Sequence, residues 1–137
     1  MTYLIIQYSG CKIIFFDAGS YLVTSTLFIP DGTIIVGEIW SEIMGSGPRF
    51  GDPTHPVPVV KVGTPCSGGG VMEISDIIFT TRGASKHDIC SSLDHINKCL
   101  APGAIVVEWN AADPPGQKGA VGTWDTHIRR VSISIIY

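Results

Sequence analysis

The sequence predicts an all-β fold in which short strands are joined by turns rich in glycine and proline. Apolar runs of four to eight residues, many of them β-branched, recur along the 137 residues, and such runs are typical of strands. Clusters drawn from the 16 glycines and nine prolines separate these runs, as turns require. Helical spacing of apolar residues occurs convincingly in one place, at Ile89, Leu93, Ile96 and Leu100.

Each predicted strand is an apolar run bounded by turn residues. The continuous runs IIFF and IIV predict burial on both faces of a sheet, whereas VVKV and MEISDIIF partly alternate, which predicts burial on one face. The predicted strands are IIFF (13–16), YLVTSTLFI (21–29), TIIVGEI (33–39), PVVKVG (58–63), VMEISDIIFTT (71–81), GAIVVEW (103–109) and VSISIIY (131–137).

Two architectures compete for these strands: a sandwich or barrel closed by hairpins, and a solenoid of parallel strands. Hairpins favour two-residue Asn-Gly or Asp-Gly loops between alternating strands. PDGT (30–33) is the one stretch of this kind. A solenoid stacks each strand on the equivalent strand of the next turn, which gives aliphatic ladders inside and glycine-rich corners. We therefore favour the solenoid.

Composition and charge exclude several classes of partner. Hydrophobic residues make up 45% of the chain and charged residues 15%, below the roughly 25% of ordinary domains. The net charge of -3 and the absence of a Lys/Arg block argue against nucleic-acid and anionic-membrane partners. No apolar run approaches the roughly 18 residues of a membrane span. The first residues lack the basic region of a signal peptide, and the four cysteines leave the redox compartment open.

The sharpest site-like cluster is KHDICSSLDHINKCL (86–100), which contains His87, Cys90, His95 and Cys99 with the spacing H-x2-C-x4-H-x3-C. Four such side chains can close a tetrahedral zinc site. The stretch nevertheless lacks the glycines and aromatics that let a zinc knuckle wrap its metal. Its Ile and Leu spacing favours a helical turn, which would splay the four ligands. We therefore expect a chance cluster, with no metal and no cofactor.

Several uncommon strings carry a resemblance to a known family. Residues 11–85 and 101–129 resemble the second β-helix of the fungal exo-β-1,3-glucanases, also called laminarinases or glucan 1,3-β-glucosidases. The resemblance implies a right-handed parallel β-helix of the pectate-lyase-like kind, an extracellular protein and hydrolysis of β-1,3-glucan from its ends. The matching strings are 13–47, DPTHPVPVVKVGTP (52–65), VMEISDIIFTTRG (71–83), APGAIVVEWN (101–110) and GTWDTHIR (122–129).

Two segments depart from the family pattern. The stretch 86–100 interrupts the family's TTRG-to-PGAIVVEWN connection, and the tail 131–137 replaces several further coils. Both fit a hypothesis of translated intron, which sequencing the transcript would test, while a plain insertion loop is the alternative. We expect residues 1–137 to form a single partial β-helix domain that lacks the remainder of the full-length enzyme.

The candidate catalytic groups are carboxylates, because glycoside hydrolysis needs a general acid and a second group acting on water or sugar. Glu108 stands beside Trp109, whose ring could raise a carboxyl pKa. Asp125 and His127 lie two apart on a predicted strand and could pair. The family's catalytic Glu lies in coils that follow the HIR motif, so the resemblance implies that this chain lacks it. The carboxylates considered are Glu38, Glu42, Asp52, Glu73, Asp76, Glu108, Asp113 and Asp125.

The tryptophans are the candidate substrate-binding residues. Trp40, Trp109 and Trp124 could each stack a flat apolar face on a sugar ring, although such residues more often fill a core or a corner. The partner implied by the resemblance is β-1,3-glucan. The alternative function is a non-catalytic β-solenoid carbohydrate-binding module that uses these rings.

Overall fold

The computed structural model describes residues 13–67, 69–82 and 103–130. This part of the chain is all-β, as predicted, and its one helical element is the three-residue 3-10 turn η1. The elements are β1 (Ile13–Phe16), β2 (Ser20–Val23), β3 (Leu27–Ile29), β4 (Ile34–Gly45), η1 (Pro48–Phe50), β5 (Val57–Val62), β6 (Met72–Thr81), β7 (Ala104–Trp109), β8 (Val121–Trp124) and β9 (His127–Ile128).

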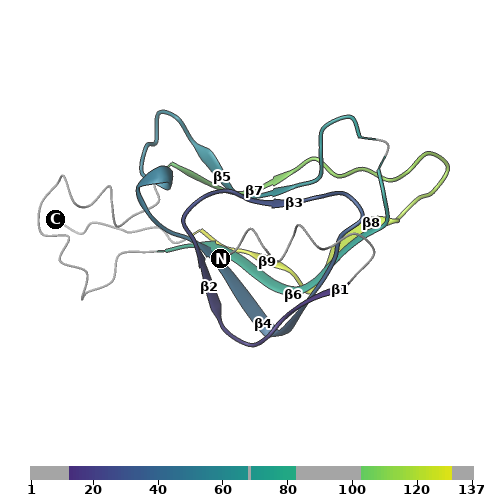
Figure 1. Cartoon of the computed structure of the whole chain (residues 1–137), viewed down its shortest axis with the longest axis horizontal. Coiled ribbons are helices and arrows are strands. Elements are labelled where there is room, and N and C mark those ends of the chain that lie inside the picture. The colour runs from purple at the N-terminus through teal and green to yellow at the C-terminus, as the bar shows by residue number, and fades with distance from the viewer. Residues whose placement is uncertain (1–12, 68, 83–102, 131–137) are drawn as a thin grey trace, which may run out of the picture.

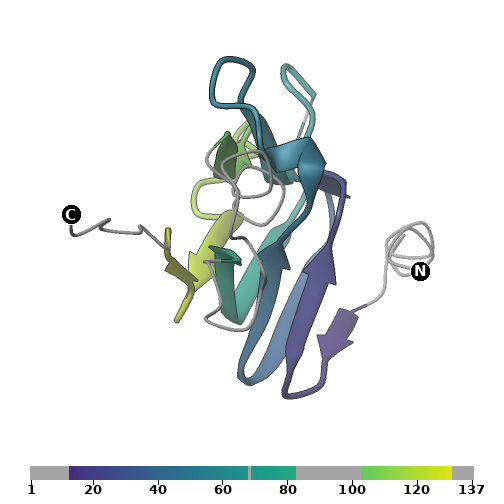
Figure 2. The same cartoon turned by 90° about the vertical axis from the view of Figure 1, so that its left-hand side faces the viewer.

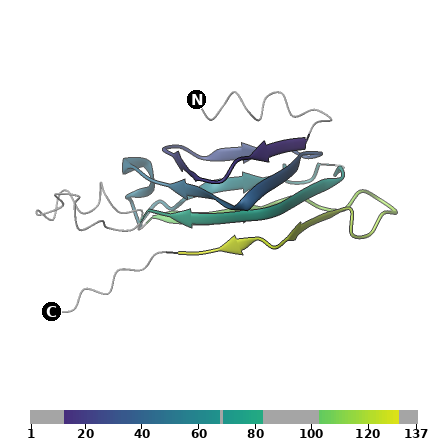
Figure 3. The ribbon, with the colours of Figure 1, turned by 90° about the horizontal axis from the view of Figure 1, so that it is seen from below.

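The strands form two sheets in which every pairing is parallel. The larger sheet has the order β1-β4-β6-β8, with β2 also pairing β4 and β9 also pairing β6, and the smaller has the order β3-β5-β7. In Figure 1 the larger sheet is bent into a V and the smaller sheet lies across its open side. Figures 2 and 3 show the strands of the larger sheet side by side in sequence order.

The bend of the larger sheet coincides with a backbone irregularity in β4. The register between β4 and β6 shifts between Val36 and Ser41, and Ile39 and Trp40 have positive φ angles of 48° and 58°. The bend is tight, because a Cβ atom added to Gly37 would collide with the backbone carbonyl oxygen of Asp76. Glycine is therefore the residue that this corner admits.

The core lies between the two sheets and is built from columns of aligned side chains. Ile14, Ile35 and Ile74 occupy equivalent positions of β1, β4 and β6, and all three are buried. Burial of such aliphatic columns is the main favourable term in folding. Further columns are Tyr21, Ile43 and Phe79, which continues to the exposed Ile128; Leu27, Val60 and Val107; and Ile29 and Val62, which continues to the partly exposed Trp109.

Most predicted strands are confirmed within a residue or two, and the differences have physical causes. YLVTSTLFI divides into β2 and β3, because the chain turns at 24–26. The strand predicted to end at residue 39 continues to Gly45, because the bulge at the bend does not end its pairing with β6. β8 and β9 were not predicted, because VGTW and HI are short and mix polar with apolar residues.

One further prediction is corrected. The IIFF strand is not buried on both faces: Ile13 is 65% and Phe15 57% exposed, while Ile14 and Phe16 are buried. PDGT, the one hairpin-like stretch of the sequence, is a turn that joins β3 to β4, which lie in different sheets. The predicted strand 131–137 and the helical stretch 89–100 lie outside the described residues.

Candidate functional site

The bend of the larger sheet gathers the most site-like side chains of the described chain. We call Trp40, Asp76, Trp124, Asp125 and His127 the aromatic corner. Ser75 of β6 and Trp124 of β8 are register partners, so Asp76 and Asp125, the next residues, occupy equivalent positions in neighbouring strands. Both have positive φ angles, of 57° and 47°, which Asp tolerates better than most residues. Adjacent strands lie about 4.8 Å apart, so the two carboxylates start from neighbouring backbone positions.

Trp124 lies flat on the strand that carries it. A Cβ atom added to Gly122 would lie 3.0, 3.3 and 3.5 Å from three adjacent atoms of the Trp124 six-membered ring. Distances this similar mean that the face of the ring, and not its edge, covers Gly122. Residues two apart point to the same side of a strand, and glycine at 122 leaves room for the ring. Trp124 is 48% exposed, so the opposite face of the ring meets solvent.

Trp40 reaches across β6 to the last described strand. Its ring lies 5.5 Å from the His127 ring, centroid to centroid, with an interplanar angle of 87°. Because β6 pairs with both β4 and β9, this edge-to-face contact bridges two strands that are not neighbours. Contacts of this geometry are favourable between aromatic rings. Trp40 therefore has a structural role, since its contact with His127 links β4 to β9; we call this contact the clasp. About half of the Trp40 surface remains exposed.

The free carboxylates cluster at this bend and on the strand beside it. Among the described residues, the side chains of Glu73, Asp76 and Asp125 take part in none of the hydrogen bonds or ion pairs. Glu38 and Glu42 are instead engaged with the segment before β2 and with β2, by bonds from the Ala18 amide (3.2 Å) and the Ser20 hydroxyl (2.7 Å). The free carboxylates can accept hydrogen bonds from a ligand.

Asp125 and His127 do not form the expected pair. No hydrogen bond or ion pair joins them in the described chain, and His127 instead contacts Trp40. The intervening Thr126 hydroxyl donates to the backbone carbonyls of Trp124 (3.1 Å) and Ile74 (3.3 Å), which fixes the turn between β8 and β9. As placed here, Asp125 is free to meet a ligand on its own.

Glu108 lies on the smaller sheet, away from the aromatic corner, and is already engaged. Its Oε1 accepts a hydrogen bond from Asn110 Nδ2 (2.9 Å) and pairs with Lys61 Nζ (3.0 Å). The bonds from Asn110 and Lys61 hold the pKa of Glu108 below its ordinary value. This is opposite to the rise considered from the Trp109 neighbour. A carboxyl that stays ionised suits a base or a structural ion pair and not a general acid.

The lowered pKa of Glu108 gives a testable pH dependence. A carboxylate whose pKa is depressed by folding contributes stability above its unfolded pKa, and that stability is lost as the pH falls through the folded pKa. Replacing Asn110 with Ala should raise the Glu108 pKa towards its ordinary value, because it removes the largest cause. A carbon-13 NMR titration of the Glu108 carboxyl measures this pKa in the unchanged chain and in Asn110→Ala. Asn110→Asp is unsuitable for the comparison because it adds a charge beside Glu108. An unchanged titration in Asn110→Ala would show that the bond is not made in solution.

Trp109 ends β7 at the position that continues the Val62 column, and its side chain is 40% exposed. It is the register partner of Val62, which pairs with Ile29, and both of these side chains are fully buried. The indole Nε1 donates to the backbone carbonyl of Ala111 (3.0 Å). Its indole is therefore held by one hydrogen bond at the end of this column, and the exposed part of the ring leaves Trp109 a candidate for sugar stacking.

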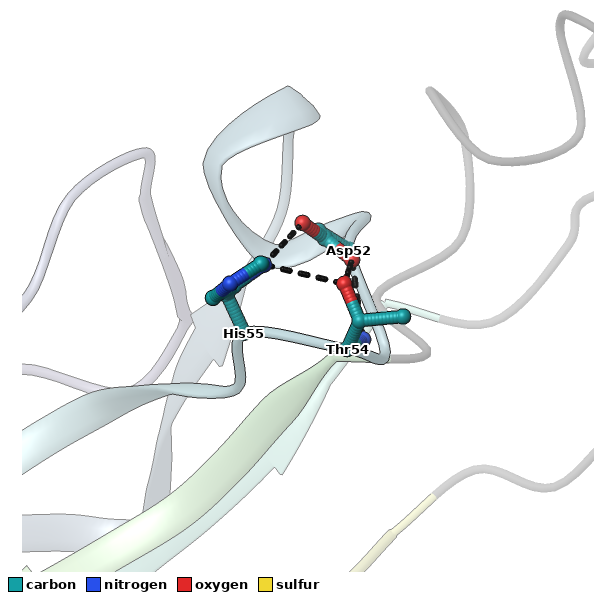
Figure 4. A network of polar contacts seen from close by, with 3 residues as sticks. All are labelled: Asp52, Thr54 and His55. Atoms are coloured by element: carbon teal, nitrogen blue, oxygen red, sulfur yellow. Dashed lines mark hydrogen bonds and ion pairs between the residues drawn. The ribbon is translucent and has the colours of Figure 1, made fainter.

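A second polar cluster, Asp52, Thr54 and His55, stabilises the loop before β5 (Figure 4). Asp52 Oδ1 accepts from the Thr54 hydroxyl (2.6 Å) and amide (2.8 Å), and Oδ2 lies 2.9 Å from His55 Nδ1. The bonds from Thr54 and then His55 lower the pKa of the Asp52 carboxyl. Because a carboxylate capping the amide two residues on is a common turn device, we interpret the cluster as a loop clamp.

Asp113 has a comparable role in the loop before β8. Its carboxylate accepts hydrogen bonds from the amides of Gly119 and Val121, both at 3.0 Å, and these bonds, led by that from Gly119, lower the pKa of Asp113. Two of the carboxylates considered from the sequence, Asp52 and Asp113, therefore have structural partners.

The described part of the chain contains neither a metal-binding cluster nor a membrane-spanning helix. His87, Cys90, His95 and Cys99 lie outside the described residues, so the cluster is not tested. Over residues 13–67, 69–82 and 103–130, no group of three His, Cys, Asp or Glu side chains converges on a cation position. No helix within these same ranges is long and apolar enough to cross a membrane.

The sequence identified the aromatic corner only in part. Trp40, Trp124, Asp125 and His127 were among the candidates, and Asp76 was among the carboxylates considered. The support of the Trp124 ring by Gly122 was missed, although a glycine two residues before a tryptophan in a strand is a readable signal. The clasp between Trp40 and His127 could not have been read, because it depends on the register of three strands.

Comparison with known proteins gives relatives but no family model, since none of the family models searched matches the sequence. The chain is 41% identical over 118 residues to a probable glucan endo-1,3-beta-glucosidase of Arthroderma benhamiae and 41% identical over 118 residues to a glucan 1,3-beta-glucosidase of Cochliobolus carbonum. It is also 34% identical over 118 residues to a protein of Penicillium expansum named non-secreted LysM effector LysM19. Each match covers 86% of this chain but 11%, 12% and 8% of the respective relative. The chain is thus similar, over most of its length, to a short segment of long proteins, one named as a probable glucan endo-1,3-beta-glucosidase and one as a glucan 1,3-beta-glucosidase.

Proposed function

We propose that this chain is a β-1,3-glucan-binding segment of a protein of the glucan 1,3-β-glucosidase family, without a complete active site of its own. The observation that carries the proposal is the half-exposed Trp124 ring, which lies flat on Gly122 at the bend where the free Asp76 and Asp125 occupy equivalent positions of neighbouring strands. An exposed ring face suits the apolar face of a pyranose. The free carboxylates of Asp76 and Asp125 suit its hydroxyl groups. The relatives' names supply the identity of the sugar.

The proposed fold is a right-handed parallel β-helix formed as one partial domain by residues 1–137. Its support is the order of pairing: β1, β2 and β3 are followed along the chain by their partners β4 and β5, then β6 and β7, then β8 and β9. Such an order arises when successive turns of one coil stack on each other. Right-handedness is the rule for about 98% of crossover connections between parallel strands of one sheet.

The absence of a general acid is also a proposal. A glycosidase acid is a carboxyl kept protonated by a raised pKa. Glu108, Asp52 and Asp113 have pKa values shifted in the opposite direction. The proposal holds that catalysis requires parts of the protein that this chain does not contain. Attack from the chain end remains a prediction, since one of the relatives is named an endo-glucosidase.

Glucan binding should depend on Trp124. In a pull-down with insoluble β-1,3-glucan, Trp124→Ala is expected to weaken binding about tenfold, or about 1.4 kcal/mol, because the stacking surface is lost. Phe28→Ala is the matched control, since Phe28 is a similarly exposed aromatic residue on the smaller sheet. Cellulose serves as the control polysaccharide. Equal binding by Trp124→Ala and the unchanged chain would contradict the proposal.

Hydrolysis tests the other half of the proposal. The purified chain should release no reducing sugar from laminarin. Turnover that disappears in Asp125→Asn would overturn the claim that the general acid is missing, and would assign that role to Asp125.

A second candidate function is a carbohydrate-binding module that is not part of a hydrolase. The match to a relative named as a LysM effector favours it, because relatives of this segment are not all named as hydrolases. That relative is named non-secreted, so the extracellular location implied by the glucanases is likewise a proposal. The two functions predict different results when the chain is joined to the remainder of a glucanase. A segment of a hydrolase should then support turnover of the glucan, whereas a binding module should not.

A further inference from the structure

The larger sheet presents a continuous outer surface that crosses its strands. Phe15, Val36, Ser75 and Trp124 are successive register partners in β1, β4, β6 and β8, and we call them the outer column. All four side chains point away from the core, since the residues that alternate with them along β1, β4 and β6, Ile14, Ile35 and Ile74, are buried. The column spans three strand spacings of about 4.8 Å, or about 14 Å.

The outer column has an aromatic residue at each end. Phe15 is 57% and Trp124 48% exposed, while Val36 and Ser75 between them are half-buried. The two rings therefore stand at the ends of a shallow strip whose middle is made of small side chains. A surface of this shape fits an extended ligand that makes a stacking contact at each end.

Polar groups lie beside the middle of this strip. Glu73 lies two residues before Ser75 on the same face of β6, is exposed and accepts no hydrogen bond among the described residues. The Ser75 hydroxyl is also without a hydrogen bond in that part of the chain. The register partners of Glu73 in the two adjacent strands are Ile34 of β4 and Gly122 of β8. Apolar ends with polar groups between them match a polysaccharide better than a hydrophobic protein surface.

Resting on the proposed function, the geometry points to a defined path for the glucan: it lies across the strands, from Trp124 over Ser75 to Phe15, with Glu73 accepting hydrogen bonds from sugar hydroxyls. The path runs along the direction in which the strands stack. It makes Phe15, a residue at the opposite end of the sheet from Trp124, a specificity-determining residue for ligand length.

The test compares laminari-oligosaccharides of two lengths by isothermal titration calorimetry on the full chain. Trp124→Ala should lower the affinity for both a disaccharide and a hexasaccharide. Phe15→Ala should lower the hexasaccharide affinity about three- to tenfold and leave the disaccharide affinity unchanged. Leu22→Ala is the matched control, because Leu22 is 53% exposed on β2, beyond the bend. Circular dichroism of each variant confirms that it is folded.

The outcomes separate the two proposals. Hexasaccharide binding that responds equally to Phe15→Ala and Leu22→Ala overturns the path and leaves the proposed function intact. Dimerisation of the chain that Phe15→Ala abolishes, without an effect on sugar affinity, also overturns the path, because the strip is then a protein contact. Failure of the unchanged chain to bind either sugar overturns the proposed function itself. As a second check, Gly122→Ala should weaken both sugars by tilting the Trp124 ring.

Discussion

Replacing Phe79 with alanine is expected to lower the free energy of unfolding by about 3–5 kcal/mol, the range for removing a buried phenylalanine ring. Phe79 is 1% exposed and lies in β6, an interior strand of the larger sheet. Its column neighbour Ile43 is equally buried. The lost ring leaves a cavity between two parallel sheets whose strands are fixed by backbone pairing, so the surroundings can close only in part.

The control for this substitution lies in the same column. Ile128 is the register partner of Phe79 in β9 and is 63% exposed, so Ile128→Ala should change stability by less than about 0.5 kcal/mol. Urea unfolding followed by circular dichroism measures both, with the slope compared between variants. A loss below about 1 kcal/mol in Phe79→Ala would show that the core between the sheets is not packed as described.

The second large effect is expected from Gly103→Ala, at about 3 kcal/mol, the upper end of the range for overpacking. Gly103 has an ordinary φ angle, so the cost is not conformational. An added Cβ would collide with the backbone carbonyl of Asp52. The glycine is also fixed by two hydrogen bonds, from its amide to Phe50 O and from the Val57 amide to its carbonyl, both 2.9 Å. The clash is therefore with backbone that cannot rotate away.

Gly122→Ala provides the contrast for Gly103→Ala. The atoms nearest to its added Cβ belong to the Trp124 ring, the first at 3.0 Å, and a side chain at the surface can move. The midpoint temperature of thermal unfolding should therefore fall by several degrees more in Gly103→Ala than in Gly122→Ala. Equal effects of the two substitutions would mean that the collision with Asp52 is relieved by a shift of the loop.

The fold class was predictable because strand patterning is local. β1, β5, β6 and β7 were visible as apolar runs, and parallel pairing followed from the scarcity of hairpin turns. The register was not predictable, because it depends on contacts between distant residues. The exposure of Ile13 and Phe15 shows the limit: a run of four apolar residues predicts a strand buried on both faces, but β1 lies at the edge of its sheet with one face outward.

The candidate site was predictable by residue type and not by arrangement. Tryptophans and carboxylates can be counted in any sequence, but their partners decide their roles. Lys61 and Asn110 engage Glu108, and the Ala111 carbonyl accepts a hydrogen bond from the Trp109 indole. The side chains of Trp124 and Asp125 have no such partners among the described residues. These partners depend on how the chain folds around each residue, which the short mixed run GTWDTHIR does not reveal.

The bend between Gly37 and Trp40 in β4, matched by Asp76 alone in β6, shows that turn length and strand alignment are independent in this protein. The step between aligned residues is 21 from Ile13 to Ile34, 39 from Ile34 to Glu73 and 49 from Glu73 to Gly122. A search for a fixed repeat period would miss such a stack. The same freedom makes the connections suitable acceptor sites for engineering: Arg82 and Gly103 are each fixed by backbone hydrogen bonds to neighbouring segments, so a foreign peptide could be inserted between them without shifting the sheets.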